Sequence, residues 1–331
     1  MKKYLPVALA ALVAASLLSA CGGSAKESGS SATPSGTGGT FPVTVEHKYG
    51  KTEVKKEPVR VVTLGLSDQD TVLALGIKPV GVVDWFKESP YGKWPWAKPL
   101  WGDTVPTIVG ERDDYQVEKI LTLKPDLIIA QYSGMKKDQY ETLSKIAPVV
   151  AQSAKHDDYA APWQEMTRNI GKALGRETKV NELITAIEKR FADVRTAHPE
   201  FAKQTAVVAE SYEPGKYSVF SPTDPKTLFL KEMGFQHSEA VGKLAGTQSF
   251  ADIGTERLDL LDVDRLLWVI DDPDAEKRIK EDPVYAKLKV VTAGRAVFVP
   301  YTEPPAGAAL AFNTVLSIPY GIDQLVPLLT K

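Results

Sequence analysis

Apolar residues along the chain fall into short runs, separated by stretches with helical spacing. Six runs rich in β-branched residues are predicted to be strands: 60–64, 79–83, 126–130, 205–211, 265–270 and 296–300. Stretches with helical periodicity, such as 68–76 and 225–234, lie between them. Continuous apolar strands that alternate with helices are typical of parallel sheets covered on both faces. The pattern therefore predicts an α/β fold.

Residues 177–197 carry the clearest helical pattern in the chain. Apolar side chains recur at the spacing of one helix face, at Val180, Leu183, Ile184, Ile187, Phe191 and Val194. Pro199 follows the stretch, and a helix of this length would be about 30 Å long. Because it lies near the middle of the chain, we expect it to join two lobes. These lobes would span 41–160 and 199–331, with 161–198 as a helical connector between them.

The two halves contain a related segment. "EKILTLKPDLII" begins at Glu118 and "ERLDLLDVDRLL" begins at Glu256, and both place Leu five and Asp eight residues after the glutamate. Upstream, Gly76 and Gly234 each follow a predicted helix. The interval from glycine to glutamate is about twenty residues longer in the first half. That excess coincides with 84–103, which is therefore interpreted as an insertion that its lobe does not need in order to fold.

Residues 84–103, "DWFKESPYGKWPWAKPLWGD", hold four of the six tryptophans. Three prolines and two glycines predict neither helix nor strand here. The segment follows the predicted strand 79–83 at its C-terminal end, where open parallel sheets bind ligands. We expect Trp85, Phe86, Trp94 and Trp96 to contact a ligand, and Trp101 to pack the loop onto its own lobe.

Further candidates in both halves stand near the ends of predicted strands or next to the short runs "TIVG", before Arg112, and "YSV", before Phe220. They are Arg112, Tyr132, Tyr212, Tyr217, Phe220 and Tyr301. Aromatic rings offer contact area at low entropic cost, and arginine offers a forked donor to oxygen atoms. Large aromatics and an arginine at strand ends of both lobes favour a ligand cleft between the lobes.

The N-terminus has the pattern of an exported lipoprotein. Lys2 and Lys3 precede an apolar run that ends in "LSAC", where Cys21 is the only cysteine. Residues 1–20 are predicted to be a signal peptide. The run resembles a bacterial lipobox, which implies cleavage before Cys21, lipid on its sulfur, and anchoring at the extracytoplasmic face of the cell membrane. Residues 21–40, rich in Gly, Ser and Thr, are then a flexible linker.

Charge and motif content exclude several function classes. The net charge of −2 and the lack of a basic stripe argue against nucleic acid. Four histidines without close pairing argue against a bare transition-metal site. G-x-S-x-G, Walker and G-x-G-x-x-G motifs are missing, so no cofactor and no enzymatic activity are expected. The acidic residues in 110–114 fit an exposed loop, and those in 271–282 fit a solvated helix start. An extracytoplasmic hydrolase that uses these acids remains an alternative.

The lipobox, "VEHKYGKTEVKKEPVRVVTLGLSDQDTVLALGIKPVGVV", "VGERDDYQVEKILTLKPDLIIA" and "GTERLDLLDVDRLLWV" together resemble the ferric-siderophore and cobalamin binding proteins of bacterial ABC importers. The resemblance implies two lobes with mainly parallel sheets, a single long helix joining them, and a cleft between them. It also implies a monomeric binding protein that takes a ferric siderophore to an ABC permease dimer. Haem and cobalamin remain alternative ligands.

The resemblance also carries roles for particular residues. Arg112 stands where a relative has a cleft arginine that touches hydroxamate oxygens. Glu118 and Glu256 stand where family glutamates meet arginines of the permease. Iron is then expected to arrive already wrapped in an organic chelate, so that no metal ligand is assigned to this chain.

Overall fold

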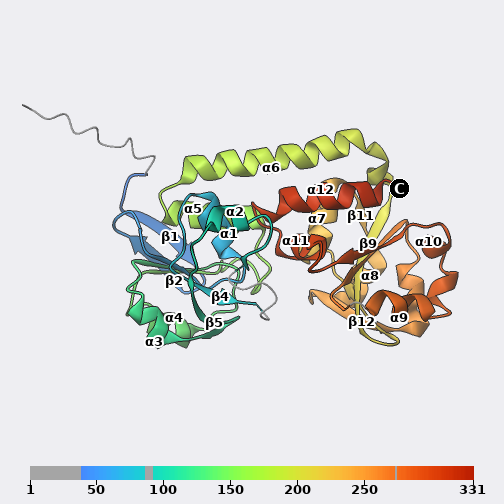
Figure 1. Ribbon diagram of the computed structural model, residues 1–331, viewed down its shortest axis with the longest axis horizontal. Coiled ribbons are helices and arrows are strands. Elements are labelled where there is room, and N and C mark those ends of the chain that lie inside the picture. Colours follow the sequence, from blue (N-terminus) through green and yellow to red (C-terminus); the bar gives the residue numbers. More distant parts are fainter. Residues whose placement is uncertain (1–38, 86–91, 273) are drawn as a thin grey trace, which may run out of the picture. The chain divides into compact units, whose positions relative to one another are not determined.

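The computed structural model of the protein describes residues 39–85, 92–272 and 274–331. Cys21, Phe86 and the predicted signal peptide lie outside the described residues. Residues 37–331 form one compact unit with a six-stranded sheet in each half and a long helix, α6 (Glu177–Ala197), that passes along both halves (Figure 1). Within the described ranges, no helix is long and apolar enough to cross a membrane.

The sheet of the N-terminal half has the strand order β6-β5-β4-β3-β7-β8, and only β5 and β6 pair antiparallel. Its strands are β3 (Val61–Thr63), β4 (Gly81–Asp84), β5 (Thr107–Glu111), β6 (Asp114–Tyr115), β7 (Leu127–Ala130) and β8 (Val149–Ala151). Its helices are α1 (Asp68–Ala74), α2 (Lys98–Trp101), α3 (Val117–Thr122) and α4 (Lys137–Leu143). An antiparallel hairpin precedes them, made of β1 (Val43–His47) and β2 (Gly50–Val54).

The sheet of the C-terminal half has the order β12-β10-β9-β13-β14, with β11 also paired to β9. Its strands are β9 (Thr205–Glu213), β10 (Lys216–Phe220), β11 (Gln236–His237), β12 (Phe250–Gly254), β13 (Arg265–Ile270) and β14 (Ala296–Pro300). Its α-helices are α7 (Pro225–Met233), α8 (Glu239–Ala245), α9 (Ala275–Glu281), α10 (Lys289–Thr292), α11 (Ala306–Phe312) and α12 (Ser317–Leu329). Short 3-10 helices are η2 (Pro199–Lys203), η3 (Thr255–Leu261) and η4 (Tyr285–Lys287).

The six strands predicted from apolar runs are confirmed as β3, β4, β7, β9, β13 and β14, and all of them pair in parallel with a neighbour among the six. The antiparallel strands β10 and β12 were not predicted as such. Their side chains do not show the regular alternation of buried and exposed residues that marks a half-exposed strand. Gly215, at φ 73°, turns the chain between β9 and β10. A short hairpin turn of this kind fixes antiparallel pairing.

The predicted connector helix is confirmed as α6. Val180, Ile184, Ile187, Phe191 and Val194 are its buried residues. It follows α5 (Trp163–Ala173) and packs against α5, α7 and α12. One continuous core cluster includes this face of α6 together with residues of both sheets. The halves are therefore joined by buried apolar contact as well as by the chain itself.

The related segments of the two halves occupy equivalent places. In each half a short helix, α3 or η3, leads into a parallel strand, β7 or β13. Asp126, eight residues after Glu118, accepts backbone N–H groups of Val59 and Arg60 at distances of 2.8–3.2 Å, just before β3. Asp264, eight residues after Glu256, accepts the N–H of Thr205 at 2.9 Å, at the start of β9. The matched aspartates therefore fix the same pair of strands in each sheet.

The described part of the tryptophan-rich segment contains a turn of helix that its prolines and glycines did not predict. Lys98–Trp101 form a turn of helix, α2, with Pro99 in the first turn, where its missing N–H is harmless. Trp101 is fully buried against Leu73 and Val82, as expected for packing onto its own half. The interpretation of 84–103 as an insertion dispensable for folding is therefore corrected, because part of it completes a core cluster.

Candidate functional site

A cavity of about 560 Å³ lies at the C-terminal ends of the parallel strands and has walls from both halves. Six of the residues predicted from strand ends line it: Trp85, Arg112, Tyr132, Tyr212, Phe220 and Tyr301. Its size is in the range of small-molecule binding sites, roughly 300–1,000 Å³. The cavity is therefore the candidate functional site.

The N-terminal wall is a layer of three side chains from three strand ends. Trp85 follows β4, Arg112 follows β5 and Tyr132 follows β7. The Trp85 and Tyr132 rings stack with centroids 6.4 Å apart, and the Arg112 guanidinium lies 5.7 Å from the Trp85 ring centroid. A cation over an indole face is favourable. This wall thus offers a flat aromatic surface with a forked cation beside it.

The backbone around Arg112 is held in an uncommon conformation. Arg112 has φ 49°, in the left-handed region, and starts the turn between β5 and β6. Its N–H donates to the carbonyl of Asp84 at 3.0 Å, which ties the end of β5 to the end of β4. Gly110 has φ 152°, and a Cβ there would lie 2.1 Å from the Asp114 carbonyl oxygen. The turn that presents Arg112 therefore depends on glycine at position 110.

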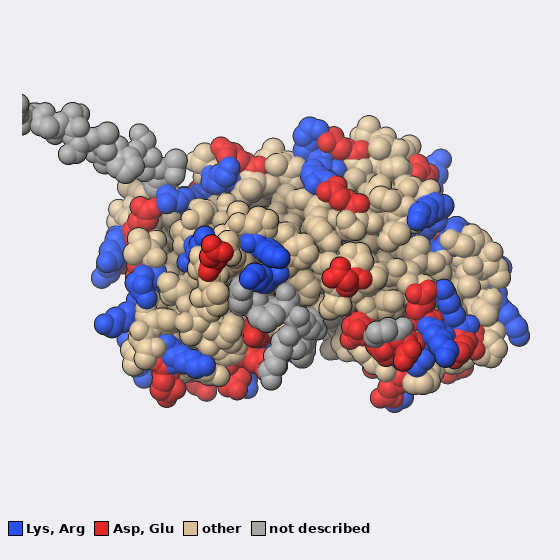
Figure 2. Space-filling model, in the orientation of Figure 1, with Lys and Arg blue, Asp and Glu red and all other residues tan. Residues whose placement is uncertain are grey.

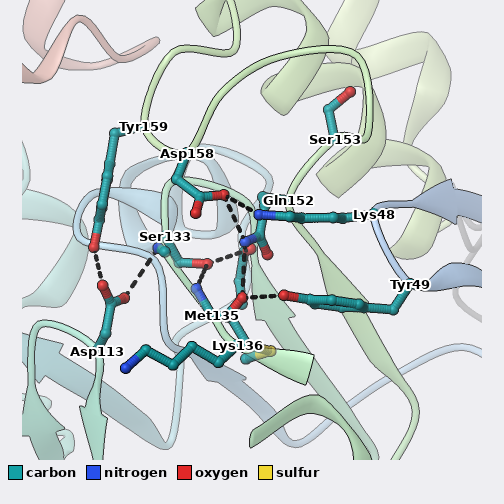
Figure 3. A network of polar contacts seen from close by, with 12 residues as sticks. Lys48, Tyr49, Asp113, Ser133, Met135, Lys136, Gln152, Ser153, Asp158 and Tyr159 are labelled. Atoms are coloured by element: carbon teal, nitrogen blue, oxygen red, sulfur yellow. Dashed lines mark hydrogen bonds and ion pairs between the residues drawn. The ribbon is translucent and has the colours of Figure 1, made fainter. Parts of the chain in front are cut away.

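Asp113, next to Arg112, anchors this turn to the loop after β7 (Figure 3). Its Oδ1 accepts the Gly134 N–H at 3.1 Å and the Tyr115 hydroxyl at 3.0 Å. Its Oδ2 accepts the hydroxyl of Tyr159, and that ring lies edge-on to Tyr132 with centroids 5.5 Å apart. Asp113 therefore fixes the spacing between Arg112 and Tyr132.

The same loop is held from its other side. Gln152 Nε2 donates to the Met135 carbonyl and to Asp158, both at 3.0 Å, and Lys48 pairs with Asp158 at 2.7 Å (Figure 3). The Tyr49 hydroxyl also donates to the Met135 carbonyl. These contacts bring the β1–β2 hairpin and the segment after β8 onto the loop that carries Tyr132. The N-terminal wall is thus braced before any ligand binds.

Tyr132 is also fixed through its backbone. The carboxylate of Asp68, in the first turn of α1, accepts the N–H of Gln131 at 2.7 Å and of Tyr132 at 3.0 Å. Burial raises the pKa of Asp68 to about 6, against the lowering effect of these hydrogen bonds. Burial also raises the pKa of the Tyr132 phenol, so its hydroxyl stays protonated and can donate.

The C-terminal wall combines aromatic rings with charge. Phe220 lies under Lys226, whose Nζ is 3.6 Å from the ring centroid and 3.4 Å from Asp224 Oδ1. Asp224 also caps α7 by accepting the Lys226 N–H at 2.9 Å. Tyr212, which is 63% exposed, donates its hydroxyl to Glu210. Burial raises the pKa of Glu210, and Lys226 and Tyr212 oppose that rise.

Sequence reasoning missed the charged part of this wall. Glu210, Asp224, Lys226 and Asp271 all line the cavity. Glu210 and Asp271 lie at the ends of predicted strands, so the rule that found the aromatics applied to them too. Asp271 was assigned to a solvated helix start, and the structure corrects this: α9 begins only at Ala275, and Asp271 directly follows β13.

Trp94 and Trp96 lie beside the cavity rather than in its lining. Their rings stack with centroids 5.4 Å apart, and Trp94, only 7% exposed, packs against Ala308 and Phe312 of α11. Trp96 donates its indole N–H to Asp70 at 2.9 Å. We therefore remove these two tryptophans from the ligand contacts, because Trp94 is buried against α11 and Trp96 lies between Trp94 and Tyr320 of α12. Of the predicted segment, Trp85 lines the cavity.

Tyr217 is likewise corrected. Side chains alternate between the faces of a strand, and Ser218 and Phe220 of β10 face the cavity. Tyr217 therefore points to the opposite face, where it is buried near Trp268 and donates to Asp282 at 2.8 Å. Its hydroxyl is used within the C-terminal half.

Comparison with known proteins places these features in a family. The family described as periplasmic binding protein matches residues 61–301. The "Probable siderophore-binding lipoprotein YfiY" of Bacillus subtilis is 28% identical over 89% of this chain and 90% of its own.

Solved structures of binding proteins are also similar to this chain. A periplasmic solute binding protein from Mycobacterium smegmatis is 33% identical, with a TM-score of 0.78 over 87% of this chain and 98% of its own. PiaA of Streptococcus pneumoniae, an iron uptake ABC transporter substrate-binding protein, is 28% identical, with a TM-score of 0.73 over 87% of this chain and 98% of its own. PiaA is also known in complex with ferrichrome, and that structure matches with a TM-score of 0.72.

Proposed function

This chain belongs to the periplasmic binding protein family, and we propose that it captures a ferric siderophore and delivers it to an ABC import permease. The observation that carries the proposal is the cavity walled by Trp85, Arg112 and Tyr132 on one side and by Phe220 and Tyr301 on the other. YfiY, a probable siderophore-binding lipoprotein, and PiaA, solved in complex with ferrichrome, both match most of this chain.

The chemistry of the walls suits an organic chelate. Such a ligand presents flat or apolar faces and carbonyl-type oxygens, with its iron enclosed. The stacked rings of Trp85 and Tyr132 supply contact area, and Arg112 supplies paired donors for the oxygens. Because Asp68 and Asp113 already hold this wall, little ordering is left for the ligand to impose, which favours affinity.

The proposal also includes the cellular location of the protein. We place the folded unit at the extracytoplasmic face of the cell membrane, held by lipid on Cys21 and a linker to about residue 40. A lipid-anchored, monomeric body with its cavity free could load ligand and dock on the permease without leaving the membrane. The lipoprotein description of the related YfiY supports this placement.

A fluorescence titration tests the ligand class. Ferric complexes quench nearby indoles, and Trp85 lines the cavity. We expect a ferric chelate from a panel of hydroxamates, catecholates and citrate to quench emission saturably, with a Kd on the order of 1 μM or tighter. Haem and cobalamin belong in the same panel, and tighter binding of either would replace the siderophore with that ligand. Turnover of a generic ester or glycoside panel would support a hydrolase instead.

A matched pair of variants locates the binding event. Arg112→Ala should weaken chelate binding by roughly 1–3 kcal/mol, and Arg112→Lys by less, because lysine keeps the charge without the fork. Arg257→Ala removes an exposed arginine of η3, outside the cavity lining, and serves as the control. Equal affinity in all of these proteins would place binding elsewhere.

Docking on the permease is assigned to Glu118 and Glu256. Both are exposed and stand in the first turn of α3 or η3, at equivalent places in the two halves. In Figure 2, acidic side chains with lysines and arginines among them lie along the edge of each half that carries α3 or β12. A two-subunit permease needs one contact on each half of its partner, and this pair supplies them. Glu256 also borders a shallow depression with Asp259, Val284 and Leu288.

The double variant Glu118→Gln/Glu256→Gln should separate binding from delivery. Chelate affinity should be unchanged, since neither residue lines the cavity. Uptake by a reconstituted transporter should fall several-fold, and the wild-type interaction should weaken as salt screens it. Glu182→Gln/Glu188→Gln makes the same charge change at exposed sites of α6, on the opposite side of the molecule from α3, and is the control. Full uptake by the first variant would leave the two glutamates as ordinary helix-start residues.

A further inference from the structure

The charged residues around the cavity are distributed unequally between its two walls. Among the described residues, its charged lining consists of two cations, Arg112 and Lys226, and three acids, Glu210, Asp224 and Asp271. The only one of these from the N-terminal half is Arg112. The acids all come from the C-terminal half, together with Lys226.

Pairing within the C-terminal wall leaves an excess of negative charge. Lys226 lies 3.4 Å from Asp224, and the two side chains are only 12% and 8% exposed, so they offset each other. Glu210 accepts the Tyr212 hydroxyl, a neutral donor that leaves the charge of the carboxylate in place. Asp271, exposed at the end of β13, lies close enough for its charge to act on Glu210. Lys226 also acts on the Glu210 carboxylate, so one cation stands against three acids and this wall keeps an excess of two negative charges.

This arrangement discriminates between iron chelates of different charge. A chelate with several free carboxylates would place their negative charges next to Glu210 and Asp271. Repulsion between these like charges would weaken its binding. A chelate with a protonated amine would place that amine against the two acids while Arg112 meets oxygens on its other side.

We propose that the cavity selects iron chelates bearing a positively charged group, such as a protonated amine, and disfavours polyanionic ferric carboxylates. The inference rests on the proposed function, because it concerns the charge of the chelate bound at that same site. Arg112 and the Trp85–Tyr132 stack hold the oxygen-bearing face of the ligand. Glu210 and Asp271 hold its cationic group.

The test uses two ligands that differ by a single charge. Ferrioxamine B is a ferric trihydroxamate with one protonated primary amine, and N-acetylation removes that charge without touching the iron-binding groups. Binding of both, and of ferric citrate, is measured by fluorescence titration of the purified protein. We expect the amine form to bind about five- to tenfold more tightly than the acetylated form, and ferric citrate to bind more weakly than either. The preference should shrink between about 0.05 M and about 0.5 M salt.

Variants assign the preference to the acidic wall. Asp271→Asn should reduce the preference for the amine form to about twofold, and Asp271→Asn/Glu210→Gln should abolish it. The acetylated ligand should lose much less affinity in the same proteins, which separates loss of charge from loss of shape. Asp193→Asn removes one exposed acid from α6, outside the cavity lining, and should keep the full preference.

The outcomes distinguish this inference from the function it rests on. Equal or tighter binding of the acetylated form, or tightest binding of ferric citrate, would overturn the charge preference while leaving iron-chelate capture intact. A preference that survives in Asp271→Asn/Glu210→Gln would overturn the role of these two acids. Absence of binding to all three complexes, and to the wider chelate panel, would overturn the proposed function and this inference together.

Discussion

Replacing Trp94 by alanine is expected to lower the free energy of unfolding by about 3–5 kcal/mol, the usual effect of removing a large buried aromatic side chain. Trp94 belongs to the N-terminal half, yet it packs against Ala308 and Phe312 of α11 in the C-terminal half. Its ring meets Phe312 at 5.6 Å and Tyr301, edge-on, at 6.2 Å between centroids. The truncation would therefore open a void where the two halves join.

Urea unfolding followed by circular dichroism measures this loss. Trp94→Phe keeps most of the buried ring and should lose less than half as much stability as Trp94→Ala. Tyr212→Ala removes an aromatic ring that is 63% exposed at the same cavity, and should change stability by less than about 1 kcal/mol. An unchanged unfolding free energy in Trp94→Ala, combined with weaker chelate binding, would make Trp94 a ligand contact after all.

Replacing Asp70 by asparagine is expected to stabilise the protein at pH 8 by about 1–3 kcal/mol. Asp70 is buried in the first turn of α1, and its Oδ2 accepts both the Trp96 indole N–H at 2.9 Å and the Thr314 hydroxyl at 2.6 Å. Thr314 lies between α11 and α12, so these bonds form a polar link between the halves. Burial raises the pKa of Asp70 to about 7, and the two hydrogen bonds oppose that rise.

The direction of the pH dependence follows from this raised pKa. The ordinary pKa of an aspartate is 3.8, and burial raises the pKa of folded Asp70 to about 7. Between these values the folded state binds the proton more strongly, so its stability falls as the pH rises through this window. Above pH 7 the full penalty of the buried charge is present. Asparagine carries no charge and keeps an oxygen that can accept both bonds, so its advantage should appear between about pH 4 and pH 7 and then stay constant.

Unfolding free energies of both proteins at pH 5, 6.5 and 8 give the comparison. Asp68→Asn is the contrasting variant, because both oxygens of Asp68 accept backbone N–H groups and an amide would face one of those donors. We expect Asp68→Asn to lower stability at pH 8 while Asp70→Asn raises it. A difference between wild type and Asp70→Asn that is the same at all three pH values would contradict the raised pKa of Asp70.

Local patterns in the sequence determined the architecture of this protein. Runs of apolar β-branched residues located six strands of the two sheets, and 3.6-residue spacing located α6 with its buried face. The half-repeat located Asp126 and Asp264, which hold equivalent strand pairs. Each of these features is marked by residues that lie only a few positions apart in the sequence. They can therefore be identified without coordinates.

The strand-end rule also predicted much of the cavity wall. Trp85, Arg112, Tyr132 and Tyr301 line the cavity because parallel strands bring their C-terminal ends to one edge of a sheet. Phe220 also lines it, although it ends β10, which pairs antiparallel with β9. The rule does not say which face of a strand points into the cavity, and it therefore included Tyr217. It was also applied only to aromatic residues and one arginine, while Asp271 was assigned to a solvated helix start and Glu210 was not considered, so the charge of the C-terminal wall was missed.

Only the tertiary structure decided what the tryptophans of 84–103 do. Ala308 and Phe312, which pack against Trp94, lie on α11. Asp70 accepts the Trp96 indole N–H and also the hydroxyl of Thr314, which lies 244 residues further along the chain. No periodicity within the segment carries information about a surface so distant in sequence. An aromatic residue in a loop can be covered by a ligand or by another part of the protein, with the same gain from burial. Which of the two occurs depends on how the halves pack, and here α11 covers Trp94 while the cavity exposes Trp85.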